Sequence, residues 1–159
     1  MNYIHCFIGV LFFIGFLGCK KQGSAETLGP PVLFKIENAQ GQDLLDPATP
    51  GYFVHDNIRK YDLINGEKKL YYKPNLAHPY GYIISKTSTE GYIMYVAPNK
   101  EEKISPTTTY IDWGNGDRDT FVFAMTKNDG AYIATTDIWY NGVSIFNVNT
   151  SPYWIKIVK

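Results

Sequence analysis

Four oxygen-bearing side chains fall within eight residues of this chain, at Asp112, Asn115, Asp117 and Asp119. Hard cations such as calcium bind about six to eight oxygen ligands, so these residues are candidate ligands of a loop metal site. The segment lacks the glycine at the sixth position and the bidentate glutamate of a helix-loop-helix calcium loop. Arg118 also adds a competing positive charge. Because Asn-Gly and Asp are also typical of hairpin turns, we interpret the segment as a turn and predict no metal site.

Two histidines beyond position 18, His55 and His78, are the candidates for acid–base chemistry. A hydrolase triad would join one of them and Asp56 to one of five serines: Ser85, Ser88, Ser105, Ser144 or Ser151. No Gly-x-Ser-x-Gly, His-Glu-x-x-His or Ser-x-x-Lys motif accompanies these residues. Glu101 and Glu102 are direct neighbours, which suits an exposed loop better than a glycosidase pair. We therefore predict a protein that is not an enzyme and has no cofactor, with a hydrolase as the second alternative.

Aromatic residues make up 16% of the chain. Exposed rings on a β face can stack on sugar rings, but most of the rings here alternate along β-rich runs, as core residues do. The rings outside that alternation are the candidates for glycan binding: Tyr72, Tyr80, Trp139 and Trp154.

The charges exclude one class of partner. The chain has 15 basic and 15 acidic residues and a net charge of zero, so it lacks the cationic excess that binding to duplex nucleic acid requires. Its cysteines, Cys6 and Cys19, both lie near the N-terminus. The rest of the chain therefore has no thiol for a disulfide, a zinc site or a cysteine nucleophile.

Residues 1–18 have the features of a secretory signal peptide. The apolar run from Ile4 to Leu17 carries no charged side chain and is shorter than the roughly 20 residues of a membrane-spanning helix. Its end, Phe16-Leu17-Gly18-Cys19, resembles the lipobox of bacterial lipoproteins. This resemblance implies cleavage before Cys19 and attachment of acyl chains to its thiol, and several chains on one residue anchor a protein stably to a membrane. The polar residues 19–31 then read as a flexible tether to a single domain at 32–159.

The domain is predicted to be all-β. Short runs rich in Tyr, Ile, Val, Phe and Thr alternate between turn signals, and no window has the apolar spacing of a helix. Asn65-Gly66 and Asn141-Gly142 each predict a tight hairpin. The expected strands cover residues 32–38, 57–64, 67–73, 80–86, 91–97, 107–113, 119–126, 131–140, 143–148 and 153–159.

This strand spacing fits an antiparallel β-sandwich, Ig-like or related, or a closed lipocalin-like barrel. Residues 39–56 are too long for a hairpin and contain Pro47, Pro50 and Gly51, as a crossover between two sheets would. We therefore favour the sandwich. The run 91–97 is apolar on both faces and should be a central strand. Trp113 should lie in the core beside Ile111, Phe121 and Phe123, and Trp139 should be less buried.

Several segments resemble small lipoproteins of Bacteroidota-type bacteria that have no assigned function. The resemblance rests on the lipobox-like start, residues 42–47, 109–117 and 138–142, and the terminal Ile157-Val158-Lys159. It implies a β fold and a cell-envelope address, with an anchor in the outer membrane, and it transfers no site residue. Residues 112–117 are also similar to a turn of PKD-type Ig-like domains, which agrees with the sandwich.

The sequence thus favours a lipid-anchored, non-enzymatic envelope protein that binds a glycan or another protein, on the periplasmic or the external side. The alternative is a lipocalin-like carrier of an apolar small molecule. A carrier needs an apolar cavity of about 300 Å³ or more, so the interior of the domain discriminates between the two.

Overall fold

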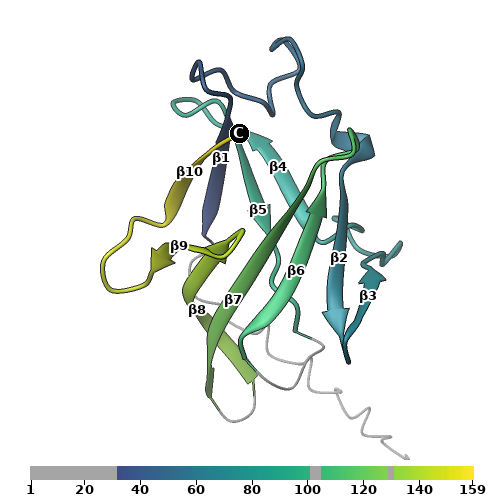
Figure 1. Ribbon diagram of the computed structural model, residues 1–159, viewed down its shortest axis with the longest axis vertical. Coiled ribbons are helices and arrows are strands. Elements are labelled where there is room, and N and C mark those ends of the chain that lie inside the picture. Colours follow the sequence, from purple (N-terminus) through teal and green to yellow (C-terminus); the bar gives the residue numbers. More distant parts are fainter. Residues whose placement is uncertain (1–31, 101–104, 129–130) are drawn as a thin grey trace, which may run out of the picture.

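The computed structural model describes residues 32–100, 105–128 and 131–159, which form two separate β-sheets facing each other (Figure 1). The predicted sandwich is confirmed. The sheets share no strand and do not close on each other, so the lipocalin-like barrel is wrong for the described residues. The single helical element among them is the 3-10 turn His55–Asn57.

The four-stranded sheet has the order β10-β1-β5-β4. Its strands are β1 (Leu33–Glu37), β4 (Tyr82–Lys86), β5 (Tyr92–Val96) and β10 (Trp154–Val158). β5 lies between β1 and β4, so its prediction as a central strand is confirmed. β1 and β10 pair in parallel, whereas the other strand pairs of the two sheets are antiparallel. No short turn joins β1 to β10, so nothing forces these two strands into antiparallel order.

The six-stranded sheet has the order β3-β2-β6-β7-β8-β9. Its strands are β2 (Arg59–Ile64), β3 (Glu67–Leu70), β6 (Thr107–Asp112), β7 (Arg118–Asn128), β8 (Ala131–Tyr140) and β9 (Val143–Asn147). Both predicted hairpins are present. Asn65 and Gly66 join β2 to β3 with φ values of 52° and 79°, and Asn141 and Gly142 join β8 to β9 with 49° and 83°. Two successive positive φ values are those of a type I′ turn.

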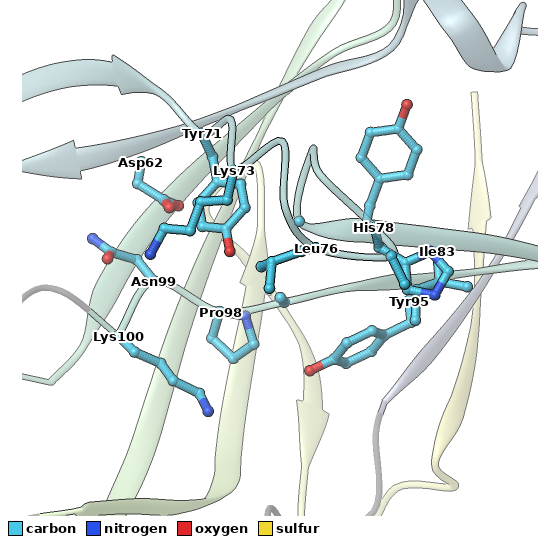
Figure 2. A pocket seen from close by; sticks show the side chains of 14 residues that line it. Asp62, Tyr71, Lys73, Leu76, His78, Ile83, Tyr95, Pro98, Asn99 and Lys100 are labelled. Carbon is cyan, nitrogen blue, oxygen red and sulfur yellow. The ribbon is translucent and has the colours of Figure 1, made fainter.

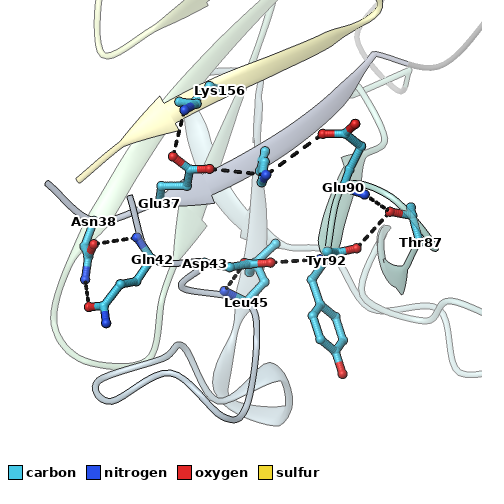
Figure 3. Close-up of polar contacts among 11 residues, drawn as sticks. Glu37, Asn38, Gln42, Asp43, Leu45, Thr87, Glu90, Tyr92 and Lys156 are labelled. Carbon is cyan, nitrogen blue, oxygen red and sulfur yellow. Dashed lines mark hydrogen bonds and ion pairs between the residues drawn. The ribbon is translucent and has the colours of Figure 1, made fainter. Parts of the chain in front are cut away.

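Residues 39–56 connect the two sheets, as predicted for a crossover, because β1 and β2 lie in different sheets. Side chains fix the start of this segment (Figure 3). The Asp43 carboxylate accepts hydrogen bonds from the backbone N–H groups of Leu45 and Tyr92, at 2.9 and 2.8 Å, which ties the crossover to β5. Leu45 is fully buried at this point.

The inner faces of the two sheets form a filled apolar core. The Phe34 ring of the four-stranded sheet lies 5.1 Å from the Phe121 ring of the six-stranded sheet, measured between centroids. Trp113 is 1% exposed and stacks on Phe53 at 4.6 Å, so its prediction as a core residue is confirmed. Trp139 is half-buried, which also agrees with the prediction.

Candidate functional site

A cavity of about 450 Å³ lies at one edge of the sandwich, next to the packed core (Figure 2). Its walls come from the end of β2, from the segment that joins β3 to β4, and from the end of β5 with the residues that follow it. Side chains of both sheets therefore meet in it. The lining residues are Asp62, Tyr71, Lys73, Leu76, Ala77, His78, Gly81, Tyr82, Ile83, Tyr95, Ala97, Pro98, Asn99 and Lys100.

The β3–β4 connection is held in place over the cavity by backbone hydrogen bonds. Lys73 N–H donates to the Pro79 carbonyl at 2.8 Å, and Ala97 N–H donates to the Gly81 carbonyl at 2.9 Å. Gly81 has a φ of +73°, and a Cβ atom there would lie 2.8 Å from the Tyr71 ring. Only glycine combines this backbone conformation with so close an approach to the ring.

One end of the cavity is mainly apolar. Figure 2 shows Ile83, Tyr95 and His78 at this end, with Leu76 and Pro98 toward the middle. Leu76 is half-exposed, at 51%, so it borders the cavity where the cavity opens. This end suits the hydrocarbon part of a ligand.

The other end is polar and is built on a buried ion pair. The Lys60 ammonium lies 2.6 Å from both carboxylate oxygens of Asp62, and the Thr109 hydroxyl donates to Asp62 at 2.7 Å. The ammonium also lies 4.3 Å from the centre of the Tyr71 ring. In Figure 2 the Lys73 side chain extends toward Asp62 and Asn99, and the Asn99 side-chain amide donates to the Leu63 carbonyl at 3.0 Å. The Lys60 charge is thus balanced within the protein, and Asp62 presents a carboxylate that is already neutralised.

Burial keeps the hydroxyl groups of two tyrosines of the cavity, Tyr82 and Tyr95, neutral. Burial raises the pKa of Tyr82 to about 12, and its single hydroxyl proton is shared between the carbonyl oxygens of His55 and Ile58, at 2.9 and 3.2 Å from the hydroxyl oxygen. Burial likewise raises the pKa of Tyr95. The hydroxyls of Tyr71 and Tyr95 point toward Leu76 and Pro98 from opposite sides (Figure 2). These groups can donate or accept hydrogen bonds but are poor bases at neutral pH.

Lys60, Asp62 and Tyr71 belong to this site although the sequence did not mark them as site residues. Alternation along β2 places Lys60 and Asp62 on one face of a strand, but it does not tell whether that face points inward. That face is the inner one, as the burial of both side chains shows.

The predicted metal candidates bind protein donors instead. Asp112 pairs with Arg118 at 2.7 Å, and the Asn115 side chain accepts from Asp117 N–H at 3.0 Å. Asp117 pairs with Lys159 at 2.6 Å, and Asp119 contacts the same ammonium. Nowhere in the described ranges do three or more His, Cys, Asp or Glu side chains gather as metal ligands would. The segment forms a β6–β7 turn, as its sequence predicts.

Burial alone would raise the pKa of Asp119, but hydrogen bonds from Lys159, Asn141, Tyr140 and Trp113 outweigh it and lower the pKa below its ordinary value. The Trp113 Nε1–H and Asn141 Nδ2–H groups lie 2.6 and 2.8 Å from the carboxylate. Asp119 is therefore an ionised acceptor that fixes the side chain of a core tryptophan. Its role is structural.

The structure does not assemble the triad considered from the sequence. The His55 Nε2 atom lies 2.7 Å from the Leu45 carbonyl oxygen, and its ring meets Tyr92 edge-on at 5.9 Å. His78 is exposed at the wall of the cavity. Within the part of the chain that the structure describes, neither ring makes a hydrogen bond to a serine.

Two of the four aromatic candidates are brought together. The rings of Tyr72 and Tyr80 lie 5.1 Å apart, and the Arg59 guanidinium lies 4.4 Å above Tyr80. Trp139 lies on β8 of the six-stranded sheet, whereas Trp154 is 45% exposed on β10 of the other sheet. These two tryptophans therefore do not share a surface with each other.

No family model, curated protein or solved structure matches the chain. The predicted signal peptide, Cys19 and the tether lie outside the described residues. None of the described residues forms a helix with the length and apolarity needed to span a membrane.

Proposed function

We propose that the domain binds a small molecule that has an apolar body and a few neutral polar groups, in the cavity beside β4 and β5. The observation that carries this proposal is the cavity itself, which at about 450 Å³ exceeds the size that a carrier needs. Its lining combines apolar side chains with a few polar groups, which is the usual make-up of a site for small ligands. A glycan or protein partner, which the sequence favours over a carried small molecule, would instead need an open surface.

The lining suggests how the ligand lies. Its apolar part would contact Leu76, Ile83 and Pro98, and its polar atoms would reach the hydroxyls of Tyr71 and Tyr95. The Lys60–Asp62 pair would offer carboxylate lone pairs at the far end without adding net charge. Each Å² of apolar surface that is removed from water in this way contributes about 25 cal/mol of favourable free energy.

The sequence also suggests where in the cell the domain acts. We infer that acyl chains on Cys19 hold the protein in the envelope, in the outer membrane, and that residues 19–31 tether the binding domain to it. The domain would then capture its ligand outside the cytoplasm and would not modify it.

Binding of a neutral apolar dye, N-phenyl-1-naphthylamine, tests the proposal. We expect the purified domain to bind the dye and the Leu76→Trp variant, in which the cavity is filled, to bind it about tenfold more weakly, a loss of about 1.4 kcal/mol. Val143→Trp is the matched control, because Val143 is also an exposed apolar residue but lies on β9, away from the cavity. Equal binding by the two variants, or no binding by the wild type, would contradict the proposal.

A further inference from the structure

The outer face of the six-stranded sheet carries tyrosines flanked by cations. On β2 the inward residues are Lys60 and Asp62, so Arg59 and Tyr61 point outward. Tyr61 is directly opposite Tyr110 on β6, and opposite residues of an antiparallel pair share one face. We call this surface, made of Arg59, Tyr61, Lys68, Tyr110 and Arg118, the tyrosine–cation face.

Its cations are held by the rings. The Lys68 ammonium lies 5.1 Å from the centre of the Tyr61 ring and 5.8 Å from that of Tyr110. The Arg118 guanidinium lies 5.7 Å from the centre of the same Tyr61 ring. Distances within about 6 Å are those at which a cation is attracted to a ring.

Arg59 is fixed more firmly. Its Nη1 atom donates to the carbonyls of Asp56 and Ile58 at 2.6 and 2.7 Å, and its guanidinium covers the Tyr80 ring. Long cationic side chains lose considerable rotamer freedom when a partner orders them, up to about 2 kcal/mol each. Arg59, Lys68 and Arg118 are already ordered by contacts within the protein. Binding of a partner would therefore cost these side chains less rotamer entropy.

The face has an excess of positive charge although the whole chain is neutral. Asp112 is the acidic residue among these cations, in one cross-strand row with Arg59 and Arg118, and it pairs with Arg118. Asp137 lies on the same side of the sheet but several residues farther along, on β8, where it accepts a hydrogen bond from Asn147. Charge complementarity therefore favours an anionic partner at the β2–β6 part of the face.

We propose that the tyrosine–cation face binds an acidic polysaccharide through the carboxylates of its uronic acid residues. Arginine pairs with carboxylates in two-point geometry, and the cations are spread over three strands, as an extended polymer requires. The adjoining Tyr72 ring, which is 51% exposed and packs beside the Tyr80 ring that Arg59 covers, offers apolar contact to sugar rings. This inference does not depend on the cavity.

Affinity electrophoresis in gels that contain polygalacturonate tests the proposal. We expect the wild type to be retarded by polygalacturonate but not by neutral dextran, and the Lys68→Gln and Arg118→Gln variants each to bind about fivefold more weakly, as loss of one charged contact predicts. Lys69→Gln is the matched control. Lys69 is the neighbour of Lys68 on β3, is 50% exposed and pairs with Glu67, but points to the other side of the strand.

Three results would overturn the proposal. The first is no retardation of the wild type, and the second is an equal effect of Lys68→Gln and Lys69→Gln, which would indicate attraction to net charge alone. The third is binding of anionic phosphatidylglycerol vesicles or single-stranded DNA with the same sensitivity to Lys68→Gln and no preference for polygalacturonate, since the partner would then be another class of polyanion.

Discussion

The Lys60 ammonium and the Asp62 carboxylate, two residues apart on β2, form an ion pair that is almost completely withdrawn from water. Lys60 is 0% exposed and Asp62 is 3% exposed, and the ammonium lies equally close to both carboxylate oxygens. Removing either partner would leave a buried charge without its main compensation, which costs about 3–5 kcal/mol in proteins.

We therefore expect Lys60→Met and Asp62→Leu each to lower the free energy of unfolding by about 3–5 kcal/mol in urea denaturation. The double variant should lose less than the sum of the two, because it leaves neither charge unpaired. Additive losses in the double variant would show that the two side chains do not stabilise each other.

Trp113 and Trp139 should respond differently to truncation. Trp113 packs on Phe53 and donates a hydrogen bond to Asp119, whereas Trp139 is half-buried on β8. Trp113→Ala should cost about 3–5 kcal/mol, a large part of a domain stability of about 5–15 kcal/mol. Thermal melts of the two Ala variants check this, and a smaller loss for Trp113→Ala than for Trp139→Ala would contradict it.

Acid should weaken the contacts of Asp119. Its folded-state pKa lies below the ordinary value of 3.8, so its contribution to stability is present above about pH 4 and is lost as the pH falls through the folded-state value. In the Asp119→Asn variant the free energy of unfolding should fall less steeply below pH 4. Part of the fall should remain, because the pKa values of Glu37 and Asp112 are also lowered. An NMR titration that places the Asp119 pKa above 4 would refute the assignment.

Local patterns predict the strands and hairpins because period-two alternation and Asn-Gly pairs act within a few residues. The cavity could not be predicted in this way. The sequence predicts strands over 67–73 and 80–86, whereas β3 ends at Leu70 and β4 begins at Tyr82. The cavity arises where the intervening segment 71–81 meets residues 95–100, which are distant in the chain. Lys60 and Asp62 alternate with Arg59 and Tyr61, so polar residues occupy both faces of β2, and the pattern alone does not tell which face points inward.

Lipid attachment to Cys19 is a prediction from the sequence. Cys19→Ser should abolish incorporation of a radioactive fatty acid in the native host and leave the protein unprocessed or released from the membrane fraction, because the acyl chains supply the anchor. Cys6→Ser, which changes the other cysteine, is the matched control and should keep the label. A wild-type protein without label would contradict the prediction.

Gly114 and Gly116, both in the β6–β7 turn, provide a matched pair for testing how that turn packs. Both have positive φ values, +82° and +90°, so an alanine at either position would be strained by about 1–2 kcal/mol. At Gly116 a Cβ atom would have nothing within 4 Å. At Gly114 it would lie 2.5 Å from the Asn57 Cβ atom and 3.0 Å from the Asn57 carbonyl oxygen.

Because the Asn57 backbone ends the 3-10 turn and cannot move aside as a flexible side chain would, Gly114→Ala carries a steric cost that Gly116→Ala lacks. Overpacking of this kind costs about 1–3 kcal/mol, so Gly114→Ala should be less stable than Gly116→Ala by about that amount in urea denaturation. The neighbouring Trp113 fluorescence should also shift in the Gly114 variant, since the turn leads directly out of that core residue. Equal stabilities would mean that the turn and Asn57 are not packed against each other. In that case Phe53 and the sheet alone would bury Trp113.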